Sequence, residues 1–147
     1  MIVRPLEPDD RAAWARLWAG YLEFYETDLD PAITEVTWTR LLDPAEPMHA
    51  LVAVRSHEIV GITHHVFHRS TWSATRYCYL EDLFTHPDAR GTGVGRALIE
   101  ATADAAAASG ATKLYWQTHQ GNATARRLYD EVAVHAGFLV YERDLPV

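Results

Sequence analysis

Residues 80–96 set the fold, and they read Leu80-Glu81-Asp82-Leu83-Phe84-Thr85, His86-Pro87-Asp88-Ala89 and Arg90-Gly91-Thr92-Gly93-Val94-Gly95-Arg96. The first segment is apolar and aromatic, which is typical of a buried strand. The second predicts a turn, because proline fixes φ and aspartate bonds its own local backbone. A helical pattern follows the glycines. A strand, a glycine-rich turn and a helix in this order allow a ligand to approach the backbone closely. The free N–H groups of the helix favour an anion such as phosphate or pyrophosphate.

The spacing of the glycines excludes two familiar phosphate-binding motifs. A dinucleotide fingerprint requires a third glycine where Arg96 stands, and a Walker loop ends in Gly-Lys-Ser/Thr, whereas this turn ends in Gly95-Arg96-Ala97. The pattern that remains is Arg90-x-x-Gly93-x-Gly95. It indicates a phosphate-binding turn, and the alternative is a tight strand–helix connection that binds no ligand.

Length and composition are those of a single globular domain spanning residues 1–147, and no apolar run approaches the length of a membrane span. The N-terminus lacks a signal-peptide pattern and Cys78 is the single cysteine, so a cytoplasmic protein is expected. The net charge of −7 argues against nucleic acid as a partner. It is compatible with a cationic substrate, although acidic residues also serve solubility.

The first half of the chain predicts an edge strand at 2–6, a helix to about Tyr25, a second helix at 31–42 and a hairpin of strands at 48–54 and 59–67. Apolar residues recur every three or four positions in the first helix. Trp18, Tyr21 and Tyr25 in this helix fit a hydrophobic core, and they also fit a pocket for an amine. The acids that follow fit a cation or a solvated face: Glu23, Glu26, Asp28 and Asp30.

Three histidines, His64, His65 and His68, lie on the second strand of the hairpin. His65 is expected to face away from the other two, because side chains alternate along a strand. No carboxylate or cysteine stands beside them at ligand spacing. The pattern therefore favours solvated or hydrogen-bonded histidines over a metal site.

The second half predicts a strand at 76–84, a helix ended by Ser109-Gly110, a strand at 113–118, a helix at 123–135 and a last strand at 138–141. Strand–helix–strand units after a helix and a hairpin predict an α/β domain with a mixed sheet.

The segment Leu80–Phe84 followed by Arg90-Gly91-Thr92-Gly93-Val94-Gly95 resembles the acetyl-CoA pyrophosphate loop of the Gcn5-related N-acetyltransferase (GNAT) family. The motif is most similar to the branch of the spermidine/spermine and histone/polyamine-type enzymes. Asn122, Ala125, Leu128 and Tyr129 match the second cofactor segment of that branch. The resemblance implies a mostly antiparallel central sheet flanked by helices, with acetyl-CoA in a splay between the two central strands.

The resemblance also implies how the co-substrate is held. Backbone N–H groups of the glycine turn hold the pyrophosphate at the helix N-terminus, and the pantetheine arm lies along the central strand like an added strand. Arg90 and Arg96 either add charge for the phosphates or face solvent. Asn122 is expected to cap its helix and also to contact the cofactor arm, and capping alone would be sufficient to explain it. The expected cofactor-binding residues are Leu83, Phe84, Thr85, Arg90, Gly91, Thr92, Gly93, Val94, Gly95, Arg96 and Asn122, and no metal is expected.

Two residues are expected to carry the chemistry. Tyr129 matches the family's tyrosine at the coenzyme sulfur, where it would act as general acid for the leaving thiolate; a core tyrosine is the alternative. Glu81 resembles the glutamate base of the polyamine branch. Neighbouring Asp82 should face the opposite side of the strand unless a bulge intervenes, and it would anchor backbone or bind substrate. Trp18 and Tyr25 are further candidates for binding the substrate. Both carboxylates also fit purely structural hydrogen bonding.

The expected function is acetyl transfer from acetyl-CoA to a primary amine of a small cationic acceptor, such as a polyamine or an amino acid, by direct attack in a ternary complex. Acetylation of a protein or peptide and a non-catalytic acyl-CoA sensor are the alternatives. The resemblance further implies a homodimer, in which the C-terminal strand could pair or swap. No membrane partner is expected.

Overall fold

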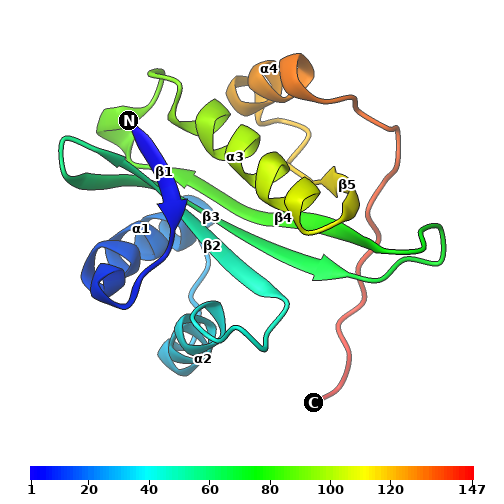
Figure 1. The fold of residues 1–147 in the computed structure, drawn as a ribbon, viewed down its shortest axis with the longest axis horizontal. Coiled ribbons are helices and arrows are strands. Elements are labelled where there is room, and N and C mark those ends of the chain that lie inside the picture. The colour runs from blue at the N-terminus through cyan, green and yellow to red at the C-terminus, as the bar shows by residue number, and fades with distance from the viewer. The chain divides into compact units, whose positions relative to one another are not determined.

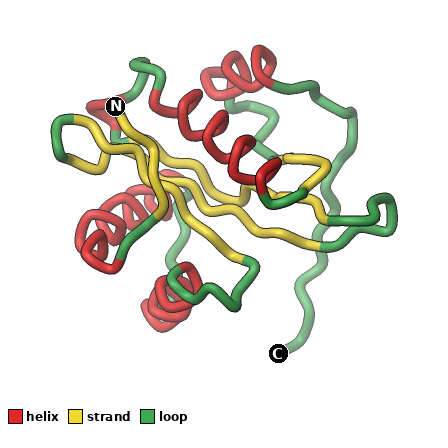
Figure 2. The backbone as a smooth tube through the Cα atoms, in the orientation of Figure 1, coloured by secondary structure: helices red, strands yellow, loops and turns green.

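The computed structural model describes all residues, 1–147, and they form two compact units, Met1–Gln117 and Thr118–Val147. The first unit holds one sheet of five strands in the order β1-β2-β3-β4-β5 (Figures 1 and 2). Neighbouring strands pair antiparallel except β4 and β5, which are parallel. The strands are β1 (Ile2–Pro5), β2 (Met48–Arg55), β3 (Glu58–His68), β4 (Arg76–Thr85) and β5 (Ala111–Tyr115). The predicted mixed α/β sheet is confirmed.

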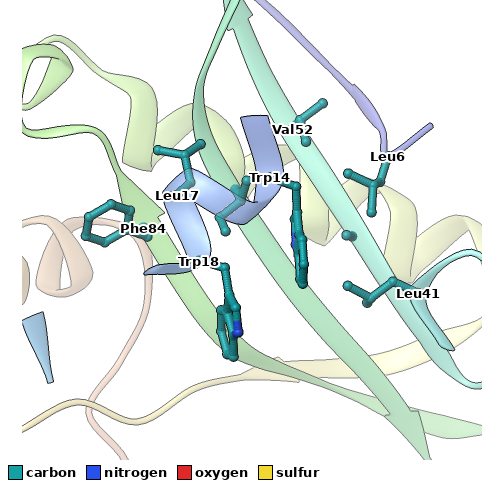
Figure 3. Close-up of a cluster of buried hydrophobic side chains, with 9 residues drawn as sticks. Leu6, Trp14, Leu17, Trp18, Leu41, Val52 and Phe84 are labelled. Carbon is teal, nitrogen blue, oxygen red and sulfur yellow. The ribbon is translucent and has the colours of Figure 1, made fainter. Parts of the chain in front are cut away.

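Helices cover both faces of this sheet. Helices α1 (Arg11–Phe24) and α2 (Pro31–Leu41) lie on one face and α3 (Val94–Ala108) lies on the other (Figure 1). On the α1 face, Trp14 and Trp18 pack with Val52 and Phe84 in the largest apolar cluster (Figure 3). None of the helices is both long and apolar enough to cross a membrane.

Local sequence explains how the elements begin and end. Pro31 opens α2, and the Asp30 side chain caps it by accepting a hydrogen bond from the Ala32 backbone N–H at 2.9 Å. Asp30 therefore has a structural role, whereas Glu23, Glu26 and Asp28 are exposed. After α3, Gly110 takes a φ of 81°, the left-handed backbone conformation that commonly ends a helix.

The second unit differs from its sequence prediction in two places. Helix α4 spans Ala123–Val132 and ends three residues before the predicted His135. The predicted last strand at 138–141 is wrong, because these residues form no regular structure. A strand needs a neighbour for its backbone hydrogen bonds, and the unit contains no strand that could supply one. The side chains of Phe138, Leu139 and Tyr141 are exposed.

The buried His65 gives the fold a sensitivity to acid. Its side chain packs against His49 and Phe67, and its Nδ1 atom has no hydrogen-bond partner. Burial, and to a lesser degree the charges of nearby histidines, lowers the pKa of His65 to about 4. In the unfolded chain a histidine titrates near a pKa of about 6.5. Between these values the unfolded state binds the additional proton, so stability falls as the pH falls.

We therefore expect the free energy of unfolding to fall by about 3 kcal/mol on account of His65 between pH 6.5 and 4. Urea denaturation at a series of pH values measures this slope. The His65→Phe variant should lose most of it, whereas His135→Gln, at an exposed histidine, should keep it. An unchanged slope in His65→Phe would show that other groups cause the acid sensitivity.

Candidate active site

Strands β4 and β5 separate halfway along β4. Their pairing runs from Arg76 opposite Ala111 to Tyr79 opposite Tyr115, and no strand pairs with that edge of β4 from Leu80 to Thr85. An unpaired strand edge presents N–H and C=O groups that an extended ligand can bond. The splay expected between the central strands is thus present, at the segment predicted to carry the chemistry.

The glycine turn at the end of β4 leaves open space where side chains would stand. Gly91 and Gly93 take φ angles of 74° and 88°, and no atom lies within 4 Å of where a Cβ on either residue would be. Gly93 is the N-cap residue of α3, and its carbonyl accepts the first helical hydrogen bond, from Ala97 N at 3.0 Å. The free N–H groups of the first turn face a space that suits a phosphate group.

Neighbouring side chains hold this turn in place. The Thr92 hydroxyl donates to the Ala89 carbonyl at 2.6 Å and accepts from the Arg55 guanidinium at 2.8 Å. The Arg90 guanidinium donates through Nε to the Thr85 carbonyl at 3.2 Å and lies 5.3 Å from the centre of the Phe84 ring. Arg90 is exposed, so its charge is available beside the turn while its Nε bonds the strand end.

A β-bulge lies at the two carboxylates. Asp82 pairs with His64 and Leu80 with His65, so Glu81 has no partner residue on β3. A bulge re-aims side chains at this point in the strand. Burial raises the pKa of the Tyr21 hydroxyl most, the charge of Asp82 raises it further, and the charge of Glu81 contributes least. The charges of both carboxylates therefore reach Tyr21 on the α1 face.

Glu81 has the properties of a proton acceptor. The residue is exposed, but the surrounding protein raises the pKa of its carboxyl by desolvation, and the charge of Asp82 raises it further. A carboxylate of raised pKa is a stronger base and lies closer to the operating pH of a general base.

Asp82 is held by buried neutral groups. The His64 Nδ1 and Asp82 Oδ2 atoms are 2.9 Å apart, and the indole Nε1 of Trp14 donates to His64 Nε2 at 2.9 Å. His64 and Trp14 are buried, whereas 14% of the Asp82 side chain is exposed. The expectation of hydrogen-bonded histidines is correct for His64, but neither His64 nor His65 is solvated.

An aromatic row on α1 borders Asp82. The Trp18 and Tyr21 rings stack with centroids 5.2 Å apart, and Tyr25 follows at 4.8 Å from Tyr21. Burial, then the charge of Asp82, raises the pKa of Tyr25. Trp18 is buried and donates to the Thr34 hydroxyl at 3.1 Å, so it forms part of the core. Tyr21 and Tyr25 are partly exposed and offer π faces and hydroxyls next to a negative charge, which suits an ammonium group.

The remaining predicted residues lie elsewhere. Val94 is buried in a second cluster on the α3 face, and the partly buried Leu83 packs against that cluster. Asn122 and Tyr129 belong to the second unit, where Asn122 is the N-cap residue of α4. Its side chain makes no capping bond and instead donates to the Thr118 hydroxyl at 3.2 Å. The capping alternative for the Asn122 side chain is therefore wrong.

Cys78 on β4 is fully buried in a cluster with Phe67 of β3 and Ala106 of α3, and burial raises the pKa of its thiol to about 11, which makes it unreactive. Sequence reasoning missed the partnership of His64 and Trp14 with Asp82. The signal for it was the pairing of the two strands, since His64 stands directly opposite Asp82. That pairing depends on a bulge that the sequence does not mark.

Comparison with known proteins identifies the family to which this fold belongs. The profile of the Acetyltransferase (GNAT) family matches residues 11–133, and the chain belongs to that family. It is 32% identical over 146 residues to a D-amino-acid N-acetyltransferase of Saccharomyces cerevisiae, a match that covers 98% of this chain and 91% of the yeast protein.

One further relative and one solved structure are similar to this chain. A thialysine N-epsilon-acetyltransferase of Caenorhabditis elegans is 32% identical over 58% of this chain and 52% of its own length. The structure of a ribosomal-protein-alanine N-acetyltransferase from Brucella melitensis biovar Abortus superposes with a TM-score of 0.80, at 24% identity, over 99% of this chain and 100% of that one. The chain is an N-acetyltransferase with the GNAT fold, as predicted, and the family uses acetyl-CoA as its co-substrate.

Proposed function

We propose that residues 1–147 act as one enzyme domain that transfers the acetyl group of acetyl-CoA to a primary amine of a small cationic acceptor. The observation that carries this proposal is the position of Glu81 and Asp82. Two carboxylates stand on the unpaired edge of β4, next to a glycine turn with room for a phosphate. The known relatives act, by their names, on D-amino acids and on thialysine, which are small amines. A polyamine, as in the branch that the motif resembles, belongs to the same chemical class.

Each group has its own role in the proposed reaction. Backbone N–H groups of the turn from Gly91 to Arg96 bind the pyrophosphate, and the free edge of β4 bonds the pantetheine arm. Asp82 attracts and orients the cationic acceptor, and Glu81 accepts the proton that the amine must lose, directly or through water. The amine nitrogen then forms a bond to the acetyl carbon as the carbon–sulfur bond breaks. The thiolate leaves with a proton from Tyr129, and the second proton that the acylated nitrogen must lose returns to the Tyr129 oxygen, directly or through water. No covalent enzyme intermediate is needed.

Release of free coenzyme A thiol tests the function. The assay supplies acetyl-CoA and, one at a time, spermidine, thialysine, lysine, several D- and L-amino acids, an aminoglycoside and a histone-tail peptide. Saturable release with a small amine is the expected result. Release with the peptide alone would replace the proposal by protein acetylation, and acetyl-CoA binding without turnover on any acceptor would favour a sensor.

Tyr129→Phe should lower kcat about 10²-fold while changing the affinity for acetyl-CoA less than about threefold, because a phenol that protonates the thiolate acts mainly in the transition state. Steady-state kinetics combined with calorimetric titration of acetyl-CoA separates the two effects. The matched control is Tyr141→Phe, at an exposed tyrosine in the same unit. Unchanged turnover in Tyr129→Phe would remove this residue from the mechanism.

We also propose a homodimer. The exposed apolar residues of the C-terminal segment, Phe138, Leu139 and Tyr141, support it, because contiguous exposed apolar side chains favour association. Analytical ultracentrifugation would give twice the chain mass, and a monomer at micromolar concentration would contradict the proposal.

A further inference from the structure

Three hydrogen-bonded side chains connect the core of the protein to the acceptor side of the site. Trp14 on α1 bonds His64 on β3, and His64 bonds Asp82 on β4, each at 2.9 Å between heavy atoms. The exposed fraction rises along this hydrogen-bonded series, from 0% for Trp14 and 2% for His64 to a partly exposed Asp82. Three separate elements therefore contribute to the orientation of one carboxylate.

The direction of the hydrogen bonds fixes the tautomer of His64. An indole N–H can only donate, so the Nε2 atom of His64 must accept and carries no proton. The single ring proton then resides on Nδ1, which donates to Asp82 Oδ2. His64 is a neutral donor in this arrangement, because both nitrogen positions are determined by their partners.

A neutral donor orients the carboxylate without cancelling its charge. The Tyr21 hydroxyl is a second neutral group near Asp82, because burial and then the charge of Asp82 raise the pKa of this hydroxyl. An ionised carboxylate offers about four acceptor positions, so the neutral Nδ1–H donor of His64 leaves capacity for a cation. Burial, and then the charge of the partly exposed Asp82, raises the pKa of both Tyr21 and Tyr25, and the adjoining rings of these tyrosines offer π faces to an ammonium group.

We infer that His64, locked by Trp14, is a positioning residue that aims Asp82 at the ammonium group of the acceptor. The inference rests on the proposed function, because it assigns the recognition of the acceptor to Asp82 and leaves proton removal to Glu81. His64 touches neither substrate. It acts by presenting its Nδ1 proton to Asp82 at a fixed place.

Two substitutions of His64 separate this role from simple packing. Asparagine places its amide N–H near the position of Nδ1, so His64→Asn keeps the donor to Asp82 and loses the acceptor for Trp14. Glutamine reaches the position of Nε2, so His64→Gln keeps a partner for Trp14 and loses the donor to Asp82. Each variant loses one buried hydrogen bond, and the pair is matched in polarity.

The test measures binding of 1,4-diaminobutane by calorimetry, together with the KM values for the acceptor and for acetyl-CoA. We expect His64→Gln to weaken diamine binding and raise the acceptor KM by at least about tenfold, the size of a lost hydrogen bond to a charged group. The KM for acetyl-CoA should change less than about twofold. His64→Asn should remain within about threefold of the wild type in all three quantities. Long-range ¹H–¹⁵N spectra of the wild type should show the neutral Nδ1–H tautomer.

Each other result decides against the inference. Equal losses in both variants, or losses that include the KM for acetyl-CoA, would assign His64 a purely structural role. No change in either variant, an Nε2–H tautomer or absence of diamine binding to the wild type would overturn the inference directly. Diamine binding with the expected pattern but without turnover on any amine would instead contradict the proposed function and leave the role of His64 intact.

Discussion

Replacing Glu81 by glutamine should lower kcat about 10²–10³-fold, the usual contribution of a general base. Desolvation and the neighbouring Asp82 raise the pKa of the Glu81 carboxyl in the folded protein. Wild-type kcat should therefore fall on the acid side as Glu81 takes up a proton and can no longer accept one from the amine. In Glu81→Gln this acid limb should disappear, because an amide does not titrate. A profile of kcat against pH measures both effects.

The control for this experiment is Glu58→Gln, at an exposed glutamate at the start of β3, far along the strand from the bulge. It should leave both the rate and the pH profile unchanged. If Glu81→Gln kept the acid limb of the wild type, the base would be another group, and Glu81 would be restricted to binding.

Truncation of Trp14 to alanine should produce the largest loss of stability, about 3–5 kcal/mol, as is usual for a fully buried tryptophan. The ring is completely buried, packs against Trp18 and Trp38, and donates a hydrogen bond to His64. Its removal leaves a cavity and an unpaired His64 Nε2 in the core. Urea denaturation should show a lower midpoint with little change in the slope m, and the melting temperature should fall by roughly 10 °C.

Trp72→Ala is the matched control, because this tryptophan lies in the loop between β3 and β4 with 84% of its surface exposed. Its loss should change the free energy of unfolding by less than about 0.5 kcal/mol. If Trp14→Ala lowered the free energy of unfolding no more than Trp72→Ala does, the packing on the α1 face would contribute little to stability.

Most elements of the fold could be predicted from local patterns. Residues close together in the chain determine three of these features: the apolar face of α1, the hairpin of β2 and β3, and the glycine that ends α3. The strand predicted at 138–141 failed for the opposite reason. Its residues have the composition of a strand, but a strand exists only where another strand supplies hydrogen-bond partners.

The site divides in the same way. The sequence alone determined the glycine turn with its positive φ angles and the two adjacent carboxylates, because proline, glycine and the start of a helix act through neighbouring backbone. Only the tertiary structure decided that the pairing of β5 with β4 ends at Tyr79 and that a bulge lies at Glu81. It also decided that the charges of both carboxylates reach Tyr21, and that His64, bonded to Trp14, holds Asp82. These features depend on the register between strands and on the packing of α1 against the sheet. Both are set by contacts between residues distant in sequence.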